Sequence, residues 1–178
     1  MRDDGQIRKE ILLNKENVII LANAGSGKTT IMTNKMKADL NNNKSHYTVA
    51  AVTFMNKAVK EIRDKLGKSY PTVFIGTNDS FVEKEIILPF VNDVYPGAGN
   101  LTVDYDRGFS SYEEGINLIK SESTIGVYEG RNIKKNFKFD LALKILENSA
   151  AASQYIKAKY FKIFIDEYQD SDQSMHRL

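Results

Sequence analysis

The sequence lacks cysteine altogether and has only two histidines, His46 and His176. The absence of thiols excludes disulfides, thiolate zinc sites and a cysteine nucleophile. Two histidines alone also offer little for a histidine metal site. Any catalysis must therefore come from carboxylates, amides, hydroxyls, lysines or a bound ion.

Long apolar runs and a strong excess of one charge are missing as well. No stretch approaches the roughly 20 apolar residues that span a bilayer, and the first residues lack the apolar core and cleavage site of a secretory signal. We therefore expect no membrane insertion and a cytoplasmic location. The 25 basic and 23 acidic residues leave a net charge of +2, so any contact with a nucleic acid has to be local.

Short apolar runs alternate with helix-compatible segments along the chain. Residues 18–22 form a continuous apolar run that leads into a glycine turn, which predicts a buried parallel strand, and residues 28–40 follow as a helix. Further strands are expected over 48–54, 72–76 and 161–165, and further helices over 56–66 and 79–89. This alternation predicts an α/β fold with a parallel sheet flanked by helices.

The pattern loosens between residues 92 and 149. A turn-rich break at 96–100 comes first, and the apolar residues that follow fit helix and strand templates only in part. A chain of 178 residues favours one main domain that carries a small insertion. We predict a main domain of residues 1–91 and 150–178, with a small, mostly helical inserted subdomain over 92–149.

A phosphate-binding pattern follows the first expected strand. Residues 22–29 match G-x-x-x-x-G-K-[ST], except that Ala22 stands in place of the first glycine. Backbone N–H groups of such a loop curl around the β-phosphate, and the next helix adds its positive N-terminal end. Lys28 would neutralise the β- and γ-phosphates, and the Thr29 hydroxyl would ligate Mg²⁺. The expected nucleotide contacts are Ala24, Gly25, Ser26, Gly27, Lys28, Thr29 and Thr30.

The alternative for this segment is a glycine turn that happens to precede Lys-Thr. The strand expected before it and the helix expected after it are the context that the phosphate-binding pattern requires. The sequence therefore favours a bound nucleotide, with ATP and Mg²⁺ as the expected cofactors.

An acidic pair follows the last expected strand. Asp166 stands where a magnesium-binding carboxylate is placed in such folds, and Glu167 could orient or deprotonate an attacking water. An isolated Asp-Glu after a strand is usually only a solvated strand end. Its combination with the phosphate loop favours the functional interpretation, with Lys28 and Glu167 as catalytic groups.

Four blocks of the sequence, at 24–29, 53–58, 76–81 and 166–170, resemble motifs I, Ia, Ib and II of UvrD/Rep-like superfamily 1 DNA helicases, in the same order. The resemblance implies a RecA-like P-loop NTPase domain with a 1B-like insertion, and an ATP-driven DNA motor as the complete protein. It also implies that Gln169 senses the γ-phosphate. Gln6 resembles the family's adenine-reading glutamine.

The same resemblance implies a set of DNA contacts. Thr53, Phe54 and Asn56 would lie along the path of single-stranded DNA, and Thr77 and Ser80 could donate to backbone phosphates. A surface phenylalanine at position 54 would give a base a stacking platform. The alternative for Phe54 is a core aromatic at the end of a strand.

Two positions depart from the family pattern. Asp79 stands where the family commonly has histidine, and a carboxylate there would repel a phosphate backbone; Met55 replaces the usual second threonine. The alternative role for Asp79 or Ser80 is to cap the helix that follows.

Residues 78–79, 134–140 and 159–172 look similar to the helicase subunit of Gabija anti-phage defence systems. That similarity implies two partners, DNA and a nuclease subunit of the overcoming-lysogenization-defect (OLD) type. The remaining helicase motifs would follow Leu178, so we expect an N-terminal fragment that binds nucleotide but hydrolyses it poorly. Two alternatives stay open: a nucleotide-dependent module that docks a nuclease without motor activity, and a P-loop kinase of a small metabolite, which would explain neither 53–58 nor 166–170.

Overall fold

The computed structural model describes residues 3–23, 25–43, 45–129, 136–168 and 175–177. It has the expected mixed α/β architecture, with short sheets and surrounding helices. The chain divides into two compact units. The first takes Met1–Gly76 and Lys159–Asp166, and the second takes Thr77–Ala158 and Glu167–Leu178. None of the helices in the described ranges combines the length and apolarity that crossing a membrane requires.

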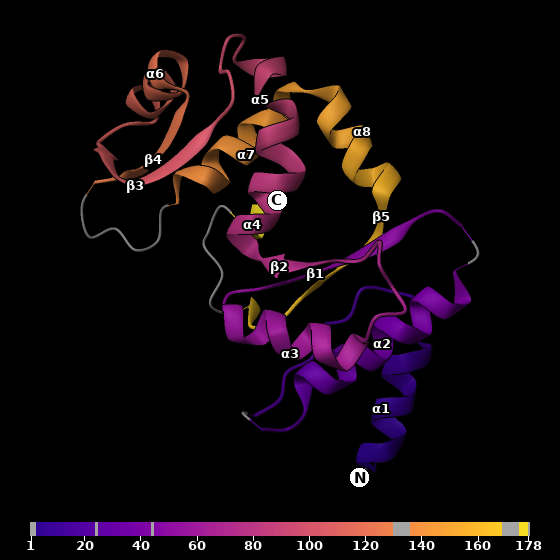
Figure 1. Cartoon of the computed structure of the whole chain (residues 1–178). Helices are drawn as coiled ribbons and strands as arrows, with labels where there is room; N and C mark the ends of the chain where they lie inside the picture. Colours follow the sequence, from indigo (N-terminus) through magenta and orange to yellow (C-terminus); the bar gives the residue numbers. More distant parts are fainter. Residues whose placement is uncertain (1–2, 24, 44, 130–135, 169–174, 178) are drawn as a thin grey trace. The chain divides into compact units, whose positions relative to one another are not determined.

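The first unit contains a three-stranded sheet and three helices (Figure 1). Its elements are α1 (Asp4–Leu13), α2 (Lys28–Asn42), β1 (Thr48–Thr53), α3 (Asn56–Leu66), β2 (Phe74–Thr77) and β5 (Tyr160–Ile165). The strand order β2-β1-β5 makes β1 the central strand, and β5 runs parallel to it with Val52 opposite Ile165. All six residues of β1 are buried, as expected for a strand covered on both faces.

The core of the first unit joins β1 to helices α2 and α3. Its buried members recur at i, i+4 on the helices and at i, i+2 on the strand, the spacings that place side chains on one face. They are Met32, Met36, Val49, Ala51, Ile62 and Leu66. The helix expected over 56–66 is confirmed as α3, and the strands expected over 48–54, 72–76 and 161–165 are confirmed with small shifts at their ends.

The buried strand expected over residues 18–22 is wrong. This segment has no regular secondary structure, and Ile19 and Leu21 are 80% and 91% exposed. A strand forms only where a neighbour satisfies its N–H and C=O groups. Within the described part of the chain the sheet ends at β5, and no strand pairs with 18–22. The apolar run alone could not show that this partner is missing.

The second unit is largely helical but also holds a two-stranded parallel sheet (Figure 1). Its elements are α4 (Asn78–Val82), the π-helix η1 (Glu83–Ile87), α5 (Leu88–Val94), β3 (Thr102–Phe109), α6 (Tyr112–Glu122), β4 (Thr124–Tyr128), α7 (Phe137–Asn148), α8 (Ala150–Lys159) and the 3₁₀ turn η3 (Met175–Arg177). The sequence did not predict β3 and β4. They pair closely: a Cβ on Gly126 would lie 2.2 Å from the Arg107 carbonyl oxygen, so only glycine fits there.

The helix expected over 79–89 is longer than predicted and changes its winding. It begins at Asn78 and continues through the π-helical turn η1 to Val94. Pro89 was expected near its end but lies at the start of α5. In the π turn the Leu88 N–H bonds to the Glu83 carbonyl, and this change in the hydrogen-bond pattern lets the helix continue past a residue that has no N–H.

Candidate functional site

The glycine-rich loop before α2 has the backbone conformation that its sequence requires. Gly25 and Gly27 have φ angles of 75° and 85°, in the left-handed region that glycine enters without a steric penalty. Gly27 is the N-cap of α2, and among the described residues no side chain caps this helix end. The first N–H groups of α2 are thus available to an anion, and the helix dipole favours negative charge at this position.

Lys28 and Thr29 begin α2 and lie beside this loop. The Lys28 ammonium donates to the backbone carbonyls of Ala22 and Asn23, at 3.1 and 3.3 Å. The Thr29 hydroxyl donates to the Asp166 carboxylate, with 3.1 Å between the two oxygens. The structure therefore brings together a hydroxyl and a carboxylate that stand 137 positions apart in the sequence.

The sheet explains how Asp166 reaches Thr29. Asp166 follows β5 directly, and its backbone N–H bonds to the Val52 carbonyl at 2.9 Å, which continues the parallel pairing of β1 and β5. Asp166 is buried, with only 7% of its surface exposed. A buried carboxylate needs a partner, and the Thr29 hydroxyl is one.

Thr29 and Asp166 supply the oxygen ligands that Mg²⁺ prefers. Within the described ranges no group of three or more His, Cys, Asp or Glu side chains could hold a metal ion. A hydroxyl and one carboxylate fit an ion that keeps most of its coordination shell for phosphate oxygens and water. The pair thus suits a magnesium–nucleotide complex better than a protein-only metal site.

Glu167 departs from ordinary backbone geometry. Its φ angle is 56°, which is uncommon for a residue other than glycine. Such conformations often occur at functional positions, where the surrounding structure holds them in place. Two other expected site residues, Ala24 and Gln169, lie outside the described residues.

Thr30 and Gln6, two further expected nucleotide contacts, have different surroundings. The Thr30 hydroxyl oxygen accepts a hydrogen bond from Lys65 of α3 at 2.8 Å, so this side chain is directed toward α3. Gln6 lies exposed on α1. The same helix contributes a loop contact that the sequence did not suggest: Arg8 donates to the Ser26 carbonyl at 2.9 Å.

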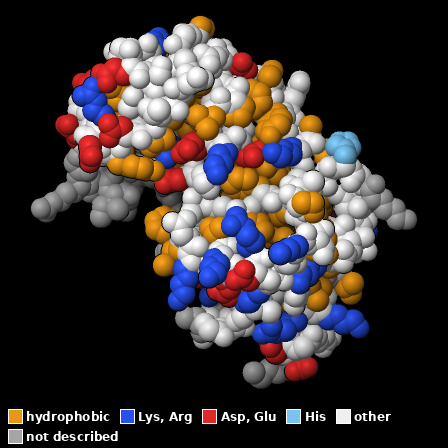
Figure 2. Space-filling view, in the orientation of Figure 1, with side chains coloured by type: hydrophobic (Ala, Val, Ile, Leu, Met, Phe, Trp, Pro, Cys, Tyr) orange, Lys and Arg blue, Asp and Glu red, His pale blue; other side chains and the backbone are white. Residues whose placement is uncertain are grey.

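The expected DNA contacts in the first unit differ in exposure. Thr53 is fully buried, and its hydroxyl has no hydrogen-bond partner in the described part of the chain. Phe54 follows it and is 60% exposed, which is inconsistent with a core aromatic. Asn56 is exposed at the start of α3. Lys and Arg side chains gather on the surface around α3 (Figure 2); its exposed basic residues are Lys57, Lys60 and Arg63.

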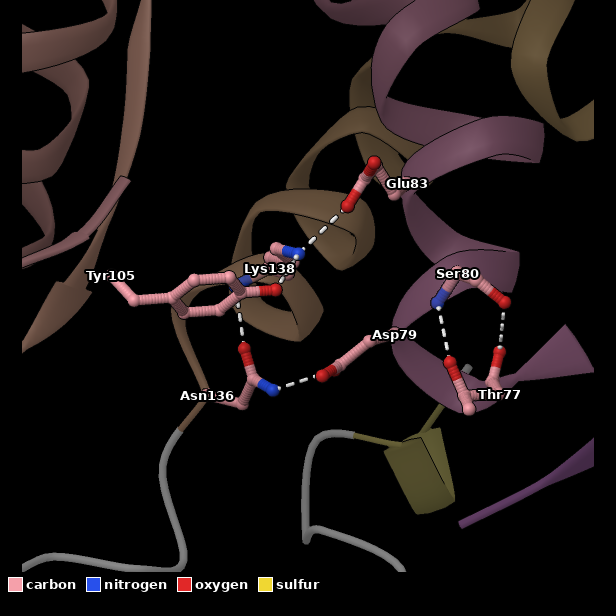
Figure 3. A network of polar contacts seen from close by, with 7 residues as sticks. All are labelled: Thr77, Asp79, Ser80, Glu83, Tyr105, Asn136 and Lys138. Atoms are coloured by element: carbon pink, nitrogen blue, oxygen red, sulfur yellow. Dashed lines mark hydrogen bonds and ion pairs between the residues drawn. The ribbon is translucent and has the colours of Figure 1, made fainter. Parts of the chain in front are cut away.

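Thr77 and Ser80 bond to each other at the start of α4 (Figure 3). Thr77 is the N-cap: its hydroxyl oxygen accepts from the Ser80 N–H at 3.2 Å. The Ser80 hydroxyl donates to the Thr77 carbonyl at 2.9 Å, which occupies its single proton. The helix cap therefore belongs to Thr77, and not to Asp79 or Ser80 as the alternative interpretation held. Asp79 instead accepts a hydrogen bond from the Asn136 amide at 2.8 Å.

A buried lysine lies close to this contact. Lys138 is 5% exposed, and its ammonium donates to the Glu83 carboxylate at 2.7 Å and to the Tyr105 hydroxyl at 3.3 Å. Burial lowers the pKa of Lys138, but the bonds to Glu83 and Tyr105 raise it by more, so the net shift is upward. Lys138 is thus held as a cation inside the second unit.

Comparison with known proteins gives a family match in the N-terminal part of the chain, and relatives that align with longer or shorter parts of it. Residues 4–91 match the family of the UvrD/REP helicase N-terminal domain. The chain is 54% identical over 174 residues to Gabija protein GajB of Bacillus cereus, an alignment that covers 96% of this chain and 35% of that protein.

Two further relatives are more distant. DNA helicase II of Salmonella typhimurium is 36% identical over 75 residues, which cover 39% of this chain and 10% of the helicase. ATP-dependent DNA helicase PcrA of Staphylococcus epidermidis is 24% identical over 210 aligned residues, which cover 90% of this chain and 29% of the helicase. The chain therefore spans 35% or less of the length of each of these relatives.

Proposed function

Because this chain is a helicase-family N-terminal domain related to the UvrD/REP helicases and to Gabija protein GajB, we propose that it is the ATP-binding part of a superfamily 1 DNA motor. The complete protein would use ATP hydrolysis to move along DNA or unwind it. The hydrogen bond between Thr29 and Asp166 carries this proposal. It joins the end of the phosphate loop to the carboxylate after β5, the two places where a magnesium–nucleotide complex needs oxygen ligands.

Several residues of the proposed ATP site have a role that their position supports. The N–H groups of Gly25 and Gly27 would surround the phosphates, and Lys28 would offset their charge. The Ser26 N–H donates to the Asn23 carbonyl at 3.2 Å, so it would have to release that carbonyl to join them. The Lys28 ammonium contacts two loop carbonyls, so it lies beside the loop that would hold the phosphates. Thr29 and Asp166 would hold Mg²⁺, which supplies Lewis-acid polarisation of the phosphoryl oxygens when bound.

The remaining roles rest on the family resemblance. Glu167 would act as the general base toward water, Gln169 would sense the γ-phosphate and Gln6 would contact adenine. We also propose that residues 1–91 and 150–178 form a RecA-like domain 1A, and that residues 92–149 form the 1B-like insertion.

For DNA, the exposed surface at the end of β1 supports the proposal best. Phe54 offers an exposed ring for base stacking, and the exposed Lys57, Lys60 and Arg63 of α3 follow it in the sequence. Asn56 would contact the DNA backbone. The buried Thr53 would support Phe54 rather than touch DNA.

In the second unit, only one of the two expected DNA phosphate contacts is proposed as a direct contact. The Thr77 hydroxyl accepts one hydrogen bond and keeps its own proton for a phosphate oxygen, whereas the Ser80 proton is already used. We therefore propose Thr77 as the phosphate contact there, and Ser80 as its support.

The similarity to Gabija protein GajB extends the proposal to anti-phage defence. As the Gabija resemblance implies, the complete protein would act with a nuclease subunit of the OLD type. A module that docks such a nuclease without motor activity is the competing function. The complete protein distinguishes the two: DNA-stimulated ATP hydrolysis supports the motor, and its absence together with nuclease binding supports the docking module.

Calorimetry of the 178-residue chain with ATP and Mg²⁺ tests the nucleotide site directly. Lys28→Ala removes the cation that offsets the phosphate charge, and we expect ATP binding to fall below detection while the circular dichroism spectrum stays unchanged. Lys37→Ala, which removes a lysine further along α2, is the matched control and should bind ATP normally. Unchanged ATP affinity in the Lys28 variant would refute the proposed site.

A further inference from the structure

Arg8 links the N-terminal helix to the phosphate loop. Its guanidinium Nη2 donates to the Ser26 carbonyl at 2.9 Å. The two terminal guanidinium nitrogens lie 3.6 and 3.7 Å from the position that a Cβ on Gly27 would take. Asp4, one turn earlier on α1, accepts from the Arg8 Nε at 2.9 Å and holds the side chain in this direction.

The rest of α1 is fixed against α2 by a second contact. Lys35 is 7% exposed, and its ammonium donates to the Leu12 carbonyl at 3.2 Å. The Asp39 carboxylate pairs with Lys35 and offsets its buried positive charge. The same carboxylate also accepts a hydrogen bond from Lys162 at 3.1 Å. The helix that carries Arg8 is therefore tied down near its C-terminal end, independently of the contact to the loop.

The bond from Arg8 acts on one peptide unit of the loop. In a trans peptide the carbonyl oxygen and the following N–H point to opposite sides. The Ser26 carbonyl points to Arg8, so the N–H of Gly27 points away from it. Gly27 is the N-cap of α2, and its N–H is part of the group of donors that the proposed ATP site offers to phosphate.

A charged donor on the Ser26 carbonyl also changes the strength of that N–H. Hydrogen bonds from ionised groups are roughly twice as strong as neutral ones, and bonds in a chain polarise one another. A peptide whose oxygen is bound by a guanidinium is a better donor at its nitrogen. Arg8 thus both orients the Gly27 N–H and strengthens it.

We propose that Arg8 is a positioning residue of the phosphate loop, which holds the Ser26–Gly27 peptide so that the Gly27 N–H faces the nucleotide phosphates. This inference rests on the proposed ATP site. Arg8 itself does not touch the phosphates. Its contribution is to order the loop before the nucleotide arrives, which lowers the entropic cost of binding.

Two measurements on the Arg8→Gln variant of the 178-residue chain test the inference. The first is calorimetry with inorganic tripolyphosphate and Mg²⁺, and separately with ATP and Mg²⁺. Because the defect lies at the phosphates, we expect both affinities to fall by the same factor, about tenfold. The second is the amide resonance of Gly27 in the nucleotide-free chain, which we expect to move upfield when the Ser26 carbonyl loses its charged donor.

Lys9→Gln is the matched control, because it removes one exposed positive charge from the same helix and leaves the Ser26 bond in place. It should bind tripolyphosphate with the wild-type affinity and leave the Gly27 resonance unmoved. An equal loss of tripolyphosphate affinity in Lys9→Gln would mean that Arg8 acts only through general electrostatic attraction. That result would overturn the inference. If Arg8→Gln melted at a lower temperature, Arg8→Lys, which keeps the charge, should restore both readouts in part.

Other outcomes also decide the matter. Unchanged tripolyphosphate affinity in Arg8→Gln would overturn the inference. A loss of affinity with an unmoved Gly27 resonance would show that Arg8 contacts the phosphates directly, and would overturn it as well. Failure of the wild-type chain to bind ATP would refute the proposed function instead. The Gly27 resonance would then still report whether Arg8 orients the peptide.

Discussion

The side-chain amide of Asn136 donates a hydrogen bond to the Asp79 carboxylate across 2.8 Å, and thereby joins α4 to the residue that caps α7 (Figure 3). The Asn136 carbonyl oxygen accepts from the Lys138 N–H at 3.0 Å. Lys138 in turn holds Glu83, one helical turn after Asp79. Two polar links thus run side by side between the helix that begins at Asn78 and the start of α7. Asp79 has a structural partner within the second unit.

We expect Lys138→Met to lower the free energy of unfolding by about 1–3 kcal/mol, because Glu83 loses a charge-assisted hydrogen bond. The raised pKa of Lys138 sets the pH dependence: its contribution is fully present below the lysine pKa of the unfolded chain, about 10.4, and is lost as the pH rises through the folded value. The difference in unfolding free energy between wild type and variant should therefore stay constant from about pH 7 to pH 9. Urea unfolding across this range measures it. A difference that shrinks toward pH 9 would mean that burial dominates and the lysine loses its proton early.

Much of the first unit could be predicted because its signals are local. The helix at 56–66 has an apolar stripe with the helical period, and the expected bounds agree with α3. The strand at 161–165 could be predicted from its short apolar run, and Asp166 from the acidic pair that follows it. Thr29 approaches Asp166 although the strand expected before the phosphate loop does not form.

The features that the sequence did not predict depend on partners far away in the chain. The apolar run at 18–22 looks like a buried strand, but burial requires a neighbouring strand that no property of the run can reveal. The bond between Asn136 and Asp79 joins residues 57 positions apart with no periodic signal. Arg8 looks like an ordinary exposed residue of a charged helix until the loop folds against it.

In the complete protein, Glu167→Gln should keep ATP binding but slow hydrolysis by roughly 10²–10⁴-fold, the range expected when a general base is lost. Asp166→Asn should instead shift the Mg²⁺ dependence to higher concentrations, because the amide is a poorer ligand and its bond to Thr29 changes. ATP turnover with single-stranded DNA over a series of Mg²⁺ concentrations measures both effects. Normal turnover by the Glu167 variant would contradict this division of roles between the two neighbours.

Phe54→Ala in the complete protein should weaken binding to single-stranded DNA by about 1–3 kcal/mol, because a stacking platform is lost. The melting temperature should barely move, since Phe54 is already 60% exposed. Tyr47→Ala removes another exposed aromatic of the first unit and serves as the control. Fluorescence anisotropy with a labelled oligonucleotide gives the affinities. Unaltered DNA affinity together with a lower melting temperature would mean that Phe54 has a packing role.

Asp79→His distinguishes a structural role of this residue from a place on the DNA path. The carboxylate is held by Asn136, so replacing it removes a hydrogen bond to a charged acceptor, and we expect a loss of about 1–3 kcal/mol in the free energy of unfolding. Asn136→Ala should cost more, because the cap of α7 is lost together with the same bond. The double variant should lose less unfolding free energy than the sum of the two single variants, since both single changes break the same Asp79–Asn136 bond.

DNA affinity provides the opposing test for the same variant. If the side chain at position 79 faced a phosphate backbone, histidine in place of a carboxylate would tighten single-stranded DNA binding. The gain would shrink with added salt, because exposed charges are screened beyond about 8–10 Å near physiological ionic strength. We expect no such gain, because the hydrogen bond from Asn136 directs the Asp79 carboxylate toward a residue of the second unit. Filter binding across a salt series, beside thermal melts of the same variants, decides the question: a salt-sensitive gain in affinity with additive stability changes would place position 79 on the DNA path.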